Sequence, residues 1–439
     1  MDNQRRIIRD GAVVVDKDRI VAVGQKSEME RNYAFEDKFG GEDFVILPGL
    51  INTHCHTEAS IYRGLCDDMS LMEFKKHVLS KTIPNYAPGD VYVASLVSLI
   101  ESVRNGVTTI LDVGVNKEES AEAAKRMGTR SIVAEAMMDC SLGEAEGPVE
   151  STEIALRKGV RLFERWNGVA DGRIKVWFGP FTELLTSPEL LEKTVALADR
   201  YRTGITMHLA ESYETQSIIK RTYGRRIFEY LEHLGILGPN LLAVHCCWLS
   251  ENEIRLMKKA NVKVSHCPSA NMKLSDGVAP LSLLDAYGII LSIGTDSALC
   301  NNCNDLLREA KTASLLQKVA MPPLDTQRIS AQRALEMITI DAARCALLDQ
   351  DIGSLEPGKK ADLVLIDIKK SHLMPVLEKP KVNIVGNLVY AGSGHDVDTV
   401  MIDGNIVMRG RAILNLDERT ILDQFQEASE TLLERSKIV

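Results

Sequence analysis

The chain has 439 residues, 45% of them hydrophobic, which is enough for a sizeable core. Because a single core rarely grows beyond about 250–300 residues, we expect one large domain and a smaller one. Lysine and arginine total 52 against 61 acidic residues, and the resulting charge of −9 argues against a nucleic-acid-binding protein. The nine cysteines suit free thiols in a reducing compartment.

The first 47 residues have the pattern of a β-hairpin, with apolar runs at 12–15 and 20–23 around a polar turn. The opening six residues are charged and polar and have no apolar run behind them, so we expect no secretory signal. The best unbroken apolar stretch, 91–100, is about half the roughly 20 residues of a membrane-spanning helix. We therefore expect a cytoplasmic protein without a membrane partner.

From residue 44 onward, short apolar runs alternate with longer amphipathic segments. The eight runs are 44–51, 107–113, 131–136, 173–178, 204–208, 241–245, 261–266 and 289–293. Helical patterns lie between them, for example at 91–104, 190–202, 251–259 and 329–347. Strand–helix alternation predicts a parallel sheet, and eight repeats predict an α/β fold of the (β/α)8 TIM-barrel type.

After residue 352 the β pattern returns, at 361–366 and 399–402, before a final helix at 415–437. Both chain ends thus share β character. We expect residues 1–47 and 353–439 to form one small discontinuous β-sandwich domain, and residues 48–352 to form the barrel.

Candidate metal ligands lie at the carboxyl ends of the predicted strands, where barrel enzymes carry their active sites. His54 and His56 follow the first run, and alternate residues of an extended chain point the same way. His208 closes the fifth run and Asp296 follows the eighth. Three histidines and a carboxylate suit zinc or ferrous iron with a position open to water, so we expect one divalent metal, Zn²⁺ or alternatively Fe²⁺.

Three further residues at these strand ends extend the predicted site. His245 and His266 close the sixth and seventh runs, so five of the nine histidines of the chain lie at strand ends. Glu211 follows His208 by three residues, where a carboxylate could move a proton between a metal-activated water and a substrate ring nitrogen.

Several motifs in this order resemble the amidohydrolase superfamily. They are Pro-Gly-Leu-Ile-Asn-Thr-His-Cys-His at 48–56, Arg-Gly at 63–64, His-Leu-Ala-Glu at 208–211, His-Cys at 245–246, Ser-His-Cys-Pro-Ser-Ala-Asn at 265–271, Gly-Thr-Asp at 294–296 and Pro-Gly-Lys-Lys-Ala-Asp-Leu at 357–363. The resemblance covers essentially the whole chain. The most similar branch holds the methylthioadenosine/S-adenosylhomocysteine deaminases and the s-triazine chlorohydrolases. Members usually open with one more strand, so we expect the small domain here to lack a strand and to expose an edge.

The resemblance implies a mononuclear site with assigned roles. His54, His56, His208 and Asp296 would hold the metal, and His245 would orient the attacking water. Glu211 would protonate the ring nitrogen, and Asp296 would pass the proton of the water to the leaving group. A bridging lysine, which binuclear members need, is absent from the end of the fourth run. A homodimer or higher homo-oligomer is usual for the family.

The function so implied is that of a C–N hydrolase. We expect a metal-dependent deaminase of an aminated purine, pterin, pyrimidine or triazine ring, attacked by hydroxide generated at the metal. The alternatives are an s-triazine-type chlorohydrolase or alkylaminohydrolase, a methylthioadenosine/S-adenosylhomocysteine deaminase and, less favoured, a non-catalytic scaffold protein.

The expected substrate contacts depart from those of nucleoside deaminases in this branch. Phe181 stands where they carry a histidine, and Asn85 and Tyr86 lie near the place of their ribose-binding acid. Aromatic surface favours a flat heterocycle over a nucleoside. The full set of expected substrate contacts is Phe74, Phe181, Trp248, His266, Asn271 and Ser297.

Overall fold

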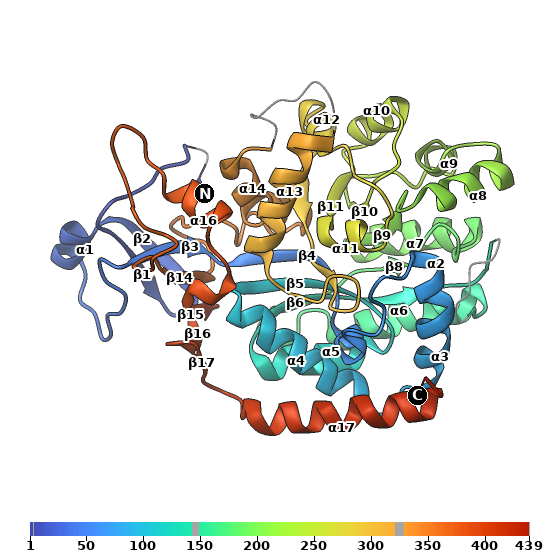
Figure 1. Ribbon diagram of the computed structural model, residues 1–439, viewed down its shortest axis with the longest axis horizontal. Coiled ribbons are helices and arrows are strands. Elements are labelled where there is room, and N and C mark those ends of the chain that lie inside the picture. The colour runs from blue at the N-terminus through green and yellow to red at the C-terminus, as the bar shows by residue number, and fades with distance from the viewer. Residues whose placement is uncertain (3, 143–148, 321–328, 439) are drawn as a thin grey trace.

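The computed structural model describes residues 1–2, 4–142, 149–320 and 329–438 (Figure 1). Its strands fall into a small antiparallel part and a larger parallel part. Among the described residues, no helix has the length and apolar content needed to cross a bilayer. All nine cysteines are free thiols.

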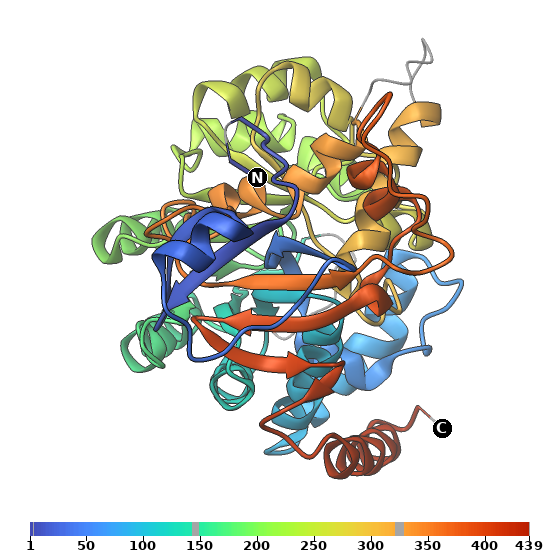
Figure 2. The same cartoon turned by 90° about the vertical axis from the view of Figure 1, so that its left-hand side faces the viewer.

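The small antiparallel sheet joins the two ends of the sequence (Figure 2). Its order is β17 (Ala412–Ile413), β16 (Asn405–Arg409), β15 (Val397–Ile402), β14 (Leu363–Asp367) and β3 (Phe44–Pro48). A separate hairpin, β1 (Gly11–Asp16) and β2 (Arg19–Gln25), precedes the helix α1 (Lys26–Asn32). The buried side chain of Ile20 packs with Leu363 and Leu365, so the hairpin contacts the sheet through an apolar cluster.

The parallel strands carry the rest of the fold. They are β4 (Leu50–His56), β5 (Val107–Gly114), β6 (Arg130–Met137), β7 (Ile174–Val176), β8 (Gly179–Pro180), β9 (Ile205–Leu209), β10 (Leu241–His245), β11 (Lys263–His266), β12 (Leu291–Ile293) and β13 (Asp296–Ser297). One sheet has the order β13-β4-β5-β6-β7, with β8 on β6, and the other has the order β12-β11-β10-β9. The parallel bridges Phe178–Ile205 and Thr182–His208 connect the two sheets. The architecture is thus the parallel α/β arrangement of TIM-barrel proteins. Its strands pair as two sheets rather than as one closed ring.

The helices lie outside the parallel strands (Figure 1). The longer ones are α4 (Asp90–Arg104), α5 (Lys117–Met127), α6 (Thr152–Trp166), α7 (Pro188–Tyr201), α8 (Tyr213–Tyr223), α10 (Glu251–Lys259), α13 (Leu306–Ala320) and α17 (Glu418–Ser436). The shorter ones are α2 (Leu71–Phe74), α3 (Ser80–Thr82), α9 (Ile227–His233), α11 (Pro268–Lys273), α12 (Leu281–Ala286), α14 (Ala331–Met337), α15 (Ile340–Cys345) and α16 (Ile384–Tyr390). A π-helical turn, η2 (Lys75–Leu79), continues α2, and the 3-10 turns are η1 (Thr57–Tyr62), η3 (Ile83–Asn85) and η4 (Gly394–Asp396).

Two predicted elements are each divided into two in the structure. The run 44–51 forms two strands rather than one barrel strand. β3 pairs with β14 in the small sheet, and β4, which begins after Gly49, belongs to a parallel sheet. A Cβ at Gly49 would overlap the side chain of Thr108, so this crossing between sheets requires glycine. The predicted helix 329–347 is two helices, α14 and α15, which are separated at Ile338–Thr339.

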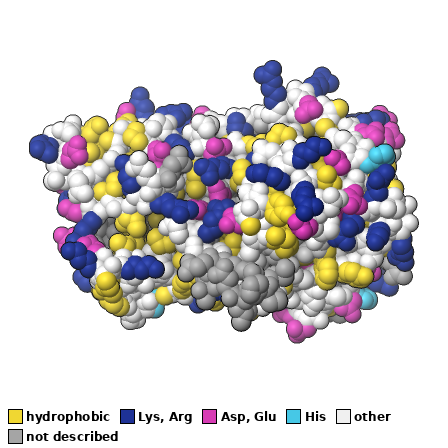
Figure 3. Space-filling view, turned by 90° about the horizontal axis from the view of Figure 1, so that it is seen from above, with side chains coloured by type: hydrophobic (Ala, Val, Ile, Leu, Met, Phe, Trp, Pro, Cys, Tyr) yellow, Lys and Arg dark blue, Asp and Glu magenta, His cyan; other side chains and the backbone are white. Residues whose placement is uncertain are grey.

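The surface agrees with the charge balance of the sequence. On the described part of the face shown in Figure 3, lysine and arginine side chains lie interspersed with aspartate and glutamate. Such a mixed surface differs from the continuous basic patch typical of nucleic-acid-binding proteins.

Candidate active site

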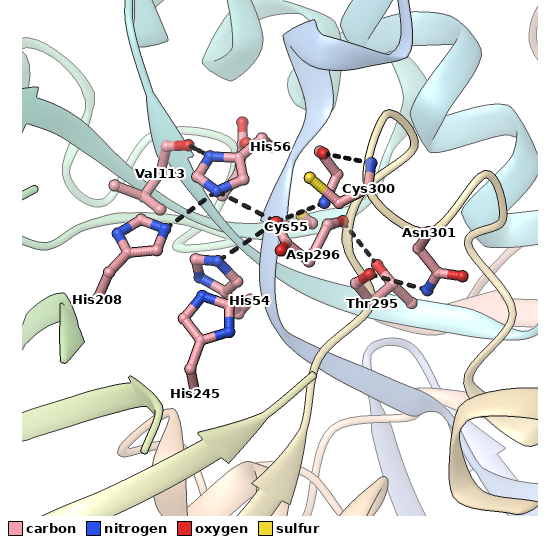
Figure 4. Close-up of polar contacts among 12 residues, drawn as sticks. His54, Cys55, His56, Val113, His208, His245, Thr295, Asp296, Cys300 and Asn301 are labelled. Carbon is pink, nitrogen blue, oxygen red and sulfur yellow. Dashed lines mark hydrogen bonds and ion pairs between the residues drawn. The ribbon is translucent and has the colours of Figure 1, made fainter. Parts of the chain in front are cut away.

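The four predicted metal ligands converge at the carboxyl ends of the parallel strands (Figure 4). His54 and His56 come from β4, His208 from β9 and Asp296 from β13. The Nε2 atoms of His56 and His208 lie 3.2 Å apart, and Asp296 Oδ1 lies 3.4 Å from His56 Nε2. The distance from the same oxygen to His54 Nε2 is 3.7 Å.

These donors form two overlapping groups that could bind a metal ion. One group is His54, His56 and Asp296, and the other is His54, His208 and His245, with the ligand atoms of each group within 4.8 Å of one another. Both ring nitrogens of His54 are buried without a hydrogen-bond partner among the described residues. A buried polar atom of this kind requires an explanation, and a bound cation supplies one. The donor set therefore fits a divalent metal.

Burial keeps these imidazoles in the neutral form that binds metals. It lowers the pKa of His56 to about 4 and, with the neighbouring histidines as a smaller cause, lowers the pKa values of His54 and His208 well below the usual range. His56 Nδ1 contacts the carbonyl oxygen of Val113, and His208 Nδ1 donates to that of Phe181 at 2.6 Å. Each contact leaves the Nε2 lone pair facing the site.

His245 is held by a different kind of contact. The side-chain amide of Asn271 donates to His245 Nδ1 at 2.9 Å, so the ring proton lies on Nε2. That Nε2 is 3.4 Å from Glu211 Oε1. An imidazole in this tautomer can donate a hydrogen bond to a reacting oxygen, which suits a role beside the metal rather than on it.

Two acidic groups lie beside the metal-binding donors. Burial, with Glu211 as the next cause, raises the pKa of Asp296 to about 7, and the Ser297 N–H donates to Asp296 Oδ1 at 2.6 Å. Glu211 is 4% exposed, and its Oε2 lies 3.9 Å from Lys75 Nζ. The site thus combines a carboxyl group that titrates near neutral pH with a second carboxylate in reach of a proton donor.

A cavity opens over this cluster. Of the sequence-predicted residues, its wall includes His56, Phe74, Phe181, His208, Glu211, Asp296 and Ser297. The remaining wall is largely apolar, with side chains such as Leu71, Leu79, Ile83, Met138 and Leu185. The structure therefore brings three of the four predicted metal donors, Glu211 and two of the three predicted aromatic contacts to one cavity wall, while the fourth donor, His54, is fully buried next to them.

Three expected substrate contacts lie outside the cavity wall. Trp248 is 38% exposed and its indole N–H donates to the carbonyl oxygen of Asp276. His266 and Asn271 are fully buried behind the wall, where Asn271 contacts His245 instead. Their contact with a substrate stays a prediction.

Sequence reasoning missed two charged residues of the cavity wall, Lys75 and Glu58. Lys75 begins the π-helical turn η2, and such turns are often found at functional sites. Glu58 lies in the 3-10 turn that follows β4. Neither position repeats with a strand or helix period, so the pattern of the sequence carried no signal for them.

Comparisons with known proteins show which proteins this chain resembles. The sequence profile described as the amidohydrolase family matches residues 45–407. The chain is 38% identical over 427 residues to the 5′-deoxyadenosine deaminase of Methanobrevibacter smithii, covering 97% of this chain and 95% of that protein. It is 34% identical over 435 residues to a 5-methylthioadenosine/S-adenosylhomocysteine deaminase of Pelotomaculum thermopropionicum, covering 99% and 97%.

Solved structures show the same fold. A zinc-bound adenosine deaminase from Xanthomonas campestris superposes with a TM-score of 0.90 at 27% identity, covering 96% of this chain and 94% of that one. A triazine hydrolase from Arthobacter aurescens superposes with a TM-score of 0.89 at 22% identity, covering 98% and 96%. The second likeness concerns the fold alone.

Proposed function

The chain belongs to the amidohydrolase family, and from this premise we propose that it is a metal-dependent deaminase that releases ammonia from an aminated nitrogen heterocycle. The observation that supports this most directly is the convergence of the donor atoms of His54, His56, His208 and Asp296. The last three of these residues line one cavity together with Glu211. We propose Zn²⁺ as the metal, with Fe²⁺ as the alternative that the same donors accept.

The residues of the site divide the chemistry among them. His54, His56, His208 and Asp296 would hold the ion, whose Lewis acidity makes hydroxide available near neutral pH. Glu211 accepts one proton of the attacking water and donates it to the ring nitrogen next to the attacked carbon. His245 Nε2–H, fixed by Asn271, donates a hydrogen bond to the attacking oxygen, on which charge develops. Asp296, buried beside the metal-binding histidines, would accept the remaining proton of the nucleophile and return it to the departing amino group.

For the substrate we propose an adenosine-type nucleoside with an apolar 5′ end. The relatives at 38% and 34% identity are deaminases of 5′-deoxyadenosine and of methylthioadenosine or S-adenosylhomocysteine. A largely apolar wall suits a methyl or thioether group at that end better than a charged one.

A free aminated ring is the second candidate. Phe181 lies in the wall, with its ring centroid 4.7 Å from that of His208, and so offers a flat apolar surface beside the metal donors. The preference for a free heterocycle, including a triazine, that the aromatic residues suggested stays a prediction, and the relatives favour the nucleoside instead.

We also propose the domain organisation expected from the sequence. The pairing of β3 with β14 and the packing of Ile20 against that sheet support a small β-sandwich domain of residues 1–47 and 353–439. The bridges between the two parallel sheets, and the pairing of β13 with β4, support a closed barrel over residues 48–352. A homodimer or higher assembly and a cytoplasmic location stay proposals.

An ammonia-release assay on the metal-loaded protein tests the proposed activity. The panel contains 5′-deoxyadenosine, methylthioadenosine, S-adenosylhomocysteine, adenine, an amino-substituted pterin and an amino-triazine. A chloro-triazine is the probe for chloride release. We expect ammonia from at least one adenosine-type nucleoside. Release of chloride alone would favour the chlorohydrolase alternative, and no release from any compound would refute the proposal.

A further inference from the structure

A buried cluster of three charged side chains lies beside the metal-binding donors. Lys117 at the start of α5 has a fully buried side chain, and its ammonium group donates to Glu58 and to Asp112 Oδ1, the latter at 2.8 Å. Asp112 is also fully buried. None of these residues has a part in the chemistry proposed above.

Glu58 is the member of this cluster that faces the cavity. Its residue and Gly114 both line the wall, and a Cβ at Gly114 would overlap Glu58 Oε1. The carboxylate therefore lies against the backbone of Gly114. The preceding residue, Val113, supplies the carbonyl oxygen that contacts His56, which places Glu58 next to a metal-binding histidine.

The hydrogen bonds of the cluster leave Glu58 with unused acceptor capacity. Both oxygens of Asp112 are occupied, because Oδ1 accepts from Lys117 and the Thr57 N–H, and Oδ2 accepts from the Thr57 hydroxyl. Glu58 Oε2 accepts from Lys117. Apart from its own backbone N–H, the described part of the chain gives Glu58 no other donor. A carboxylate has room for about four donors, so an outside donor can bind here.

The surroundings of Glu58 favour a neutral donor. Lys117 lies between two carboxylates and offsets the charge of one of them, so the cluster keeps a negative charge that attracts hydrogen-bond donors. A hydroxyl group donates one hydrogen bond without bringing a charge into a largely apolar cavity. Of the carboxylates that line the cavity, Glu211 and Asp296 serve the reacting ring, and Glu58 remains for the substituent on the ring.

We propose that Glu58 is a specificity-determining residue that accepts a hydrogen bond from a sugar hydroxyl of the substrate. This inference rests on the proposed deaminase function and specifies its substrate as a ribose-bearing ring rather than a free base. Lys117 and Asp112 act as positioning residues, because they fix the Glu58 carboxylate at the wall.

The test pairs the removal of the Glu58 charge with the removal of single hydroxyls from the substrate. We would measure kcat/KM for 5′-deoxyadenosine, for its 2′-deoxy and 3′-deoxy counterparts and for adenine, with the wild type, Glu58→Gln and Glu135→Gln. Glu135 is a matched control, because it accepts hydrogen bonds from the backbone of Asn116 and Lys117 but does not line the cavity.

We expect Glu58→Gln to lower kcat/KM for 5′-deoxyadenosine by about 10-fold, since the amide oxygen of glutamine accepts a hydrogen bond more weakly than a carboxylate does. For the analogue that lacks the bound hydroxyl, the same change should lower kcat/KM by less than about 3-fold. Glu135→Gln should affect all the substrates alike. Equal losses on every substrate with Glu58→Gln would show that Glu58 merely supports the site, and would overturn the inference.

The wild type alone decides the matter if Glu58→Gln fails to fold. A wild type that uses both deoxy analogues as well as 5′-deoxyadenosine recognises neither hydroxyl, which overturns the inference. Deamination of adenine without deamination of nucleosides also overturns it but leaves the proposed function intact. Only the absence of ammonia from every compound counts against the function itself.

Discussion

Replacing Glu211 with glutamine separates proton transfer from metal binding. Glutamine has the size and shape of glutamate but cannot carry the proton that the ring nitrogen needs. Glu211 is 4% exposed, and its ion-pair partners are His245 at 3.4 Å and Lys75 at 3.9 Å. It belongs to neither group of metal-binding donors. We therefore expect Glu211→Gln to keep its metal and lose most of its turnover.

The size of the loss follows from the role. A positioned general acid–base group contributes about 10²- to 10⁴-fold, which corresponds to about 3–5 kcal/mol of activation free energy. We expect a smaller cost to folding, because the ion pair with Lys75 is long at 3.9 Å and glutamine keeps the size and shape of glutamate. Hence kcat should fall at least 100-fold, while the melting temperature and metal content stay close to those of the wild type.

Steady-state ammonia release, metal analysis and thermal unfolding of the same preparation measure these quantities together. Glu309→Gln is the matched control, because Glu309 is equally buried and bonds to Ser269 but does not line the cavity. A Glu211→Gln enzyme with full metal and near-normal kcat would refute the proton role. Loss of metal together with activity would show instead that Glu211 is a ligand.

Three further results are expected. Purified protein should hold one divalent metal per chain, and chelation should abolish ammonia release until Zn²⁺ is restored; elemental analysis showing two metals, both needed for activity, contradicts this. Gly294→Ala should weaken metal binding about 10-fold, because the new Cβ would lie 2.8 Å from the backbone oxygen of His54, whereas Gly386→Ala, with open space around it, should not. Burial raises the pKa of Glu309 to about 7 from 4.5, so its stabilising contribution is complete below about pH 4.5 and is lost as the pH rises through 7. The melting temperature of the wild type should therefore fall more between pH 5 and pH 8 than that of Glu309→Gln.

The convergence of the candidate metal donors could be predicted because each of them follows an apolar run. The spacing of His54 and His56 matches the two-residue period of a strand, and the other donors mark the same end of later strands. The family resemblance rested on the same residues, and both the family profile and the curated relatives confirm it. The hydrophobic periodicity of the sequence thus predicts the part of the site that lies on regular strands.

The cavity wall could not be predicted in the same way. Glu58 and Lys75 belong to 3-10 and π-helical turns, and the partner of Glu58, Lys117, is 59 residues away in the sequence. Trp248 was expected in the site from its aromatic character alone, yet it lies in a loop outside the cavity wall. Contacts of this kind depend on how separate elements pack, which no local pattern records.

The predicted boundaries of helices and strands were wrong where the sequence is uniformly hydrophobic. Residues 44–51 are apolar on both sides of Gly49, so the pattern gave no sign that β3 and β4 belong to different sheets. The final helix was predicted at 415–437 and is α17 at Glu418–Ser436, where Asp417 caps its first turn. A capping residue marks a boundary that an apolar run does not.

The cavity wall is supported by α17, a helix that is synthesised late. This helix runs along α4, and Arg435 near its end pairs with Asp90 and donates to the carbonyl oxygen of Asn85 in η3 (Figure 1). Ile83 of η3 lines the cavity. Because synthesis proceeds from the N-terminus, every strand that carries a candidate metal donor is made before α17 is. A nascent chain can thus gather its metal-binding side chains early, but the wall of the pocket acquires its last support only after residues 418–436 have left the ribosome.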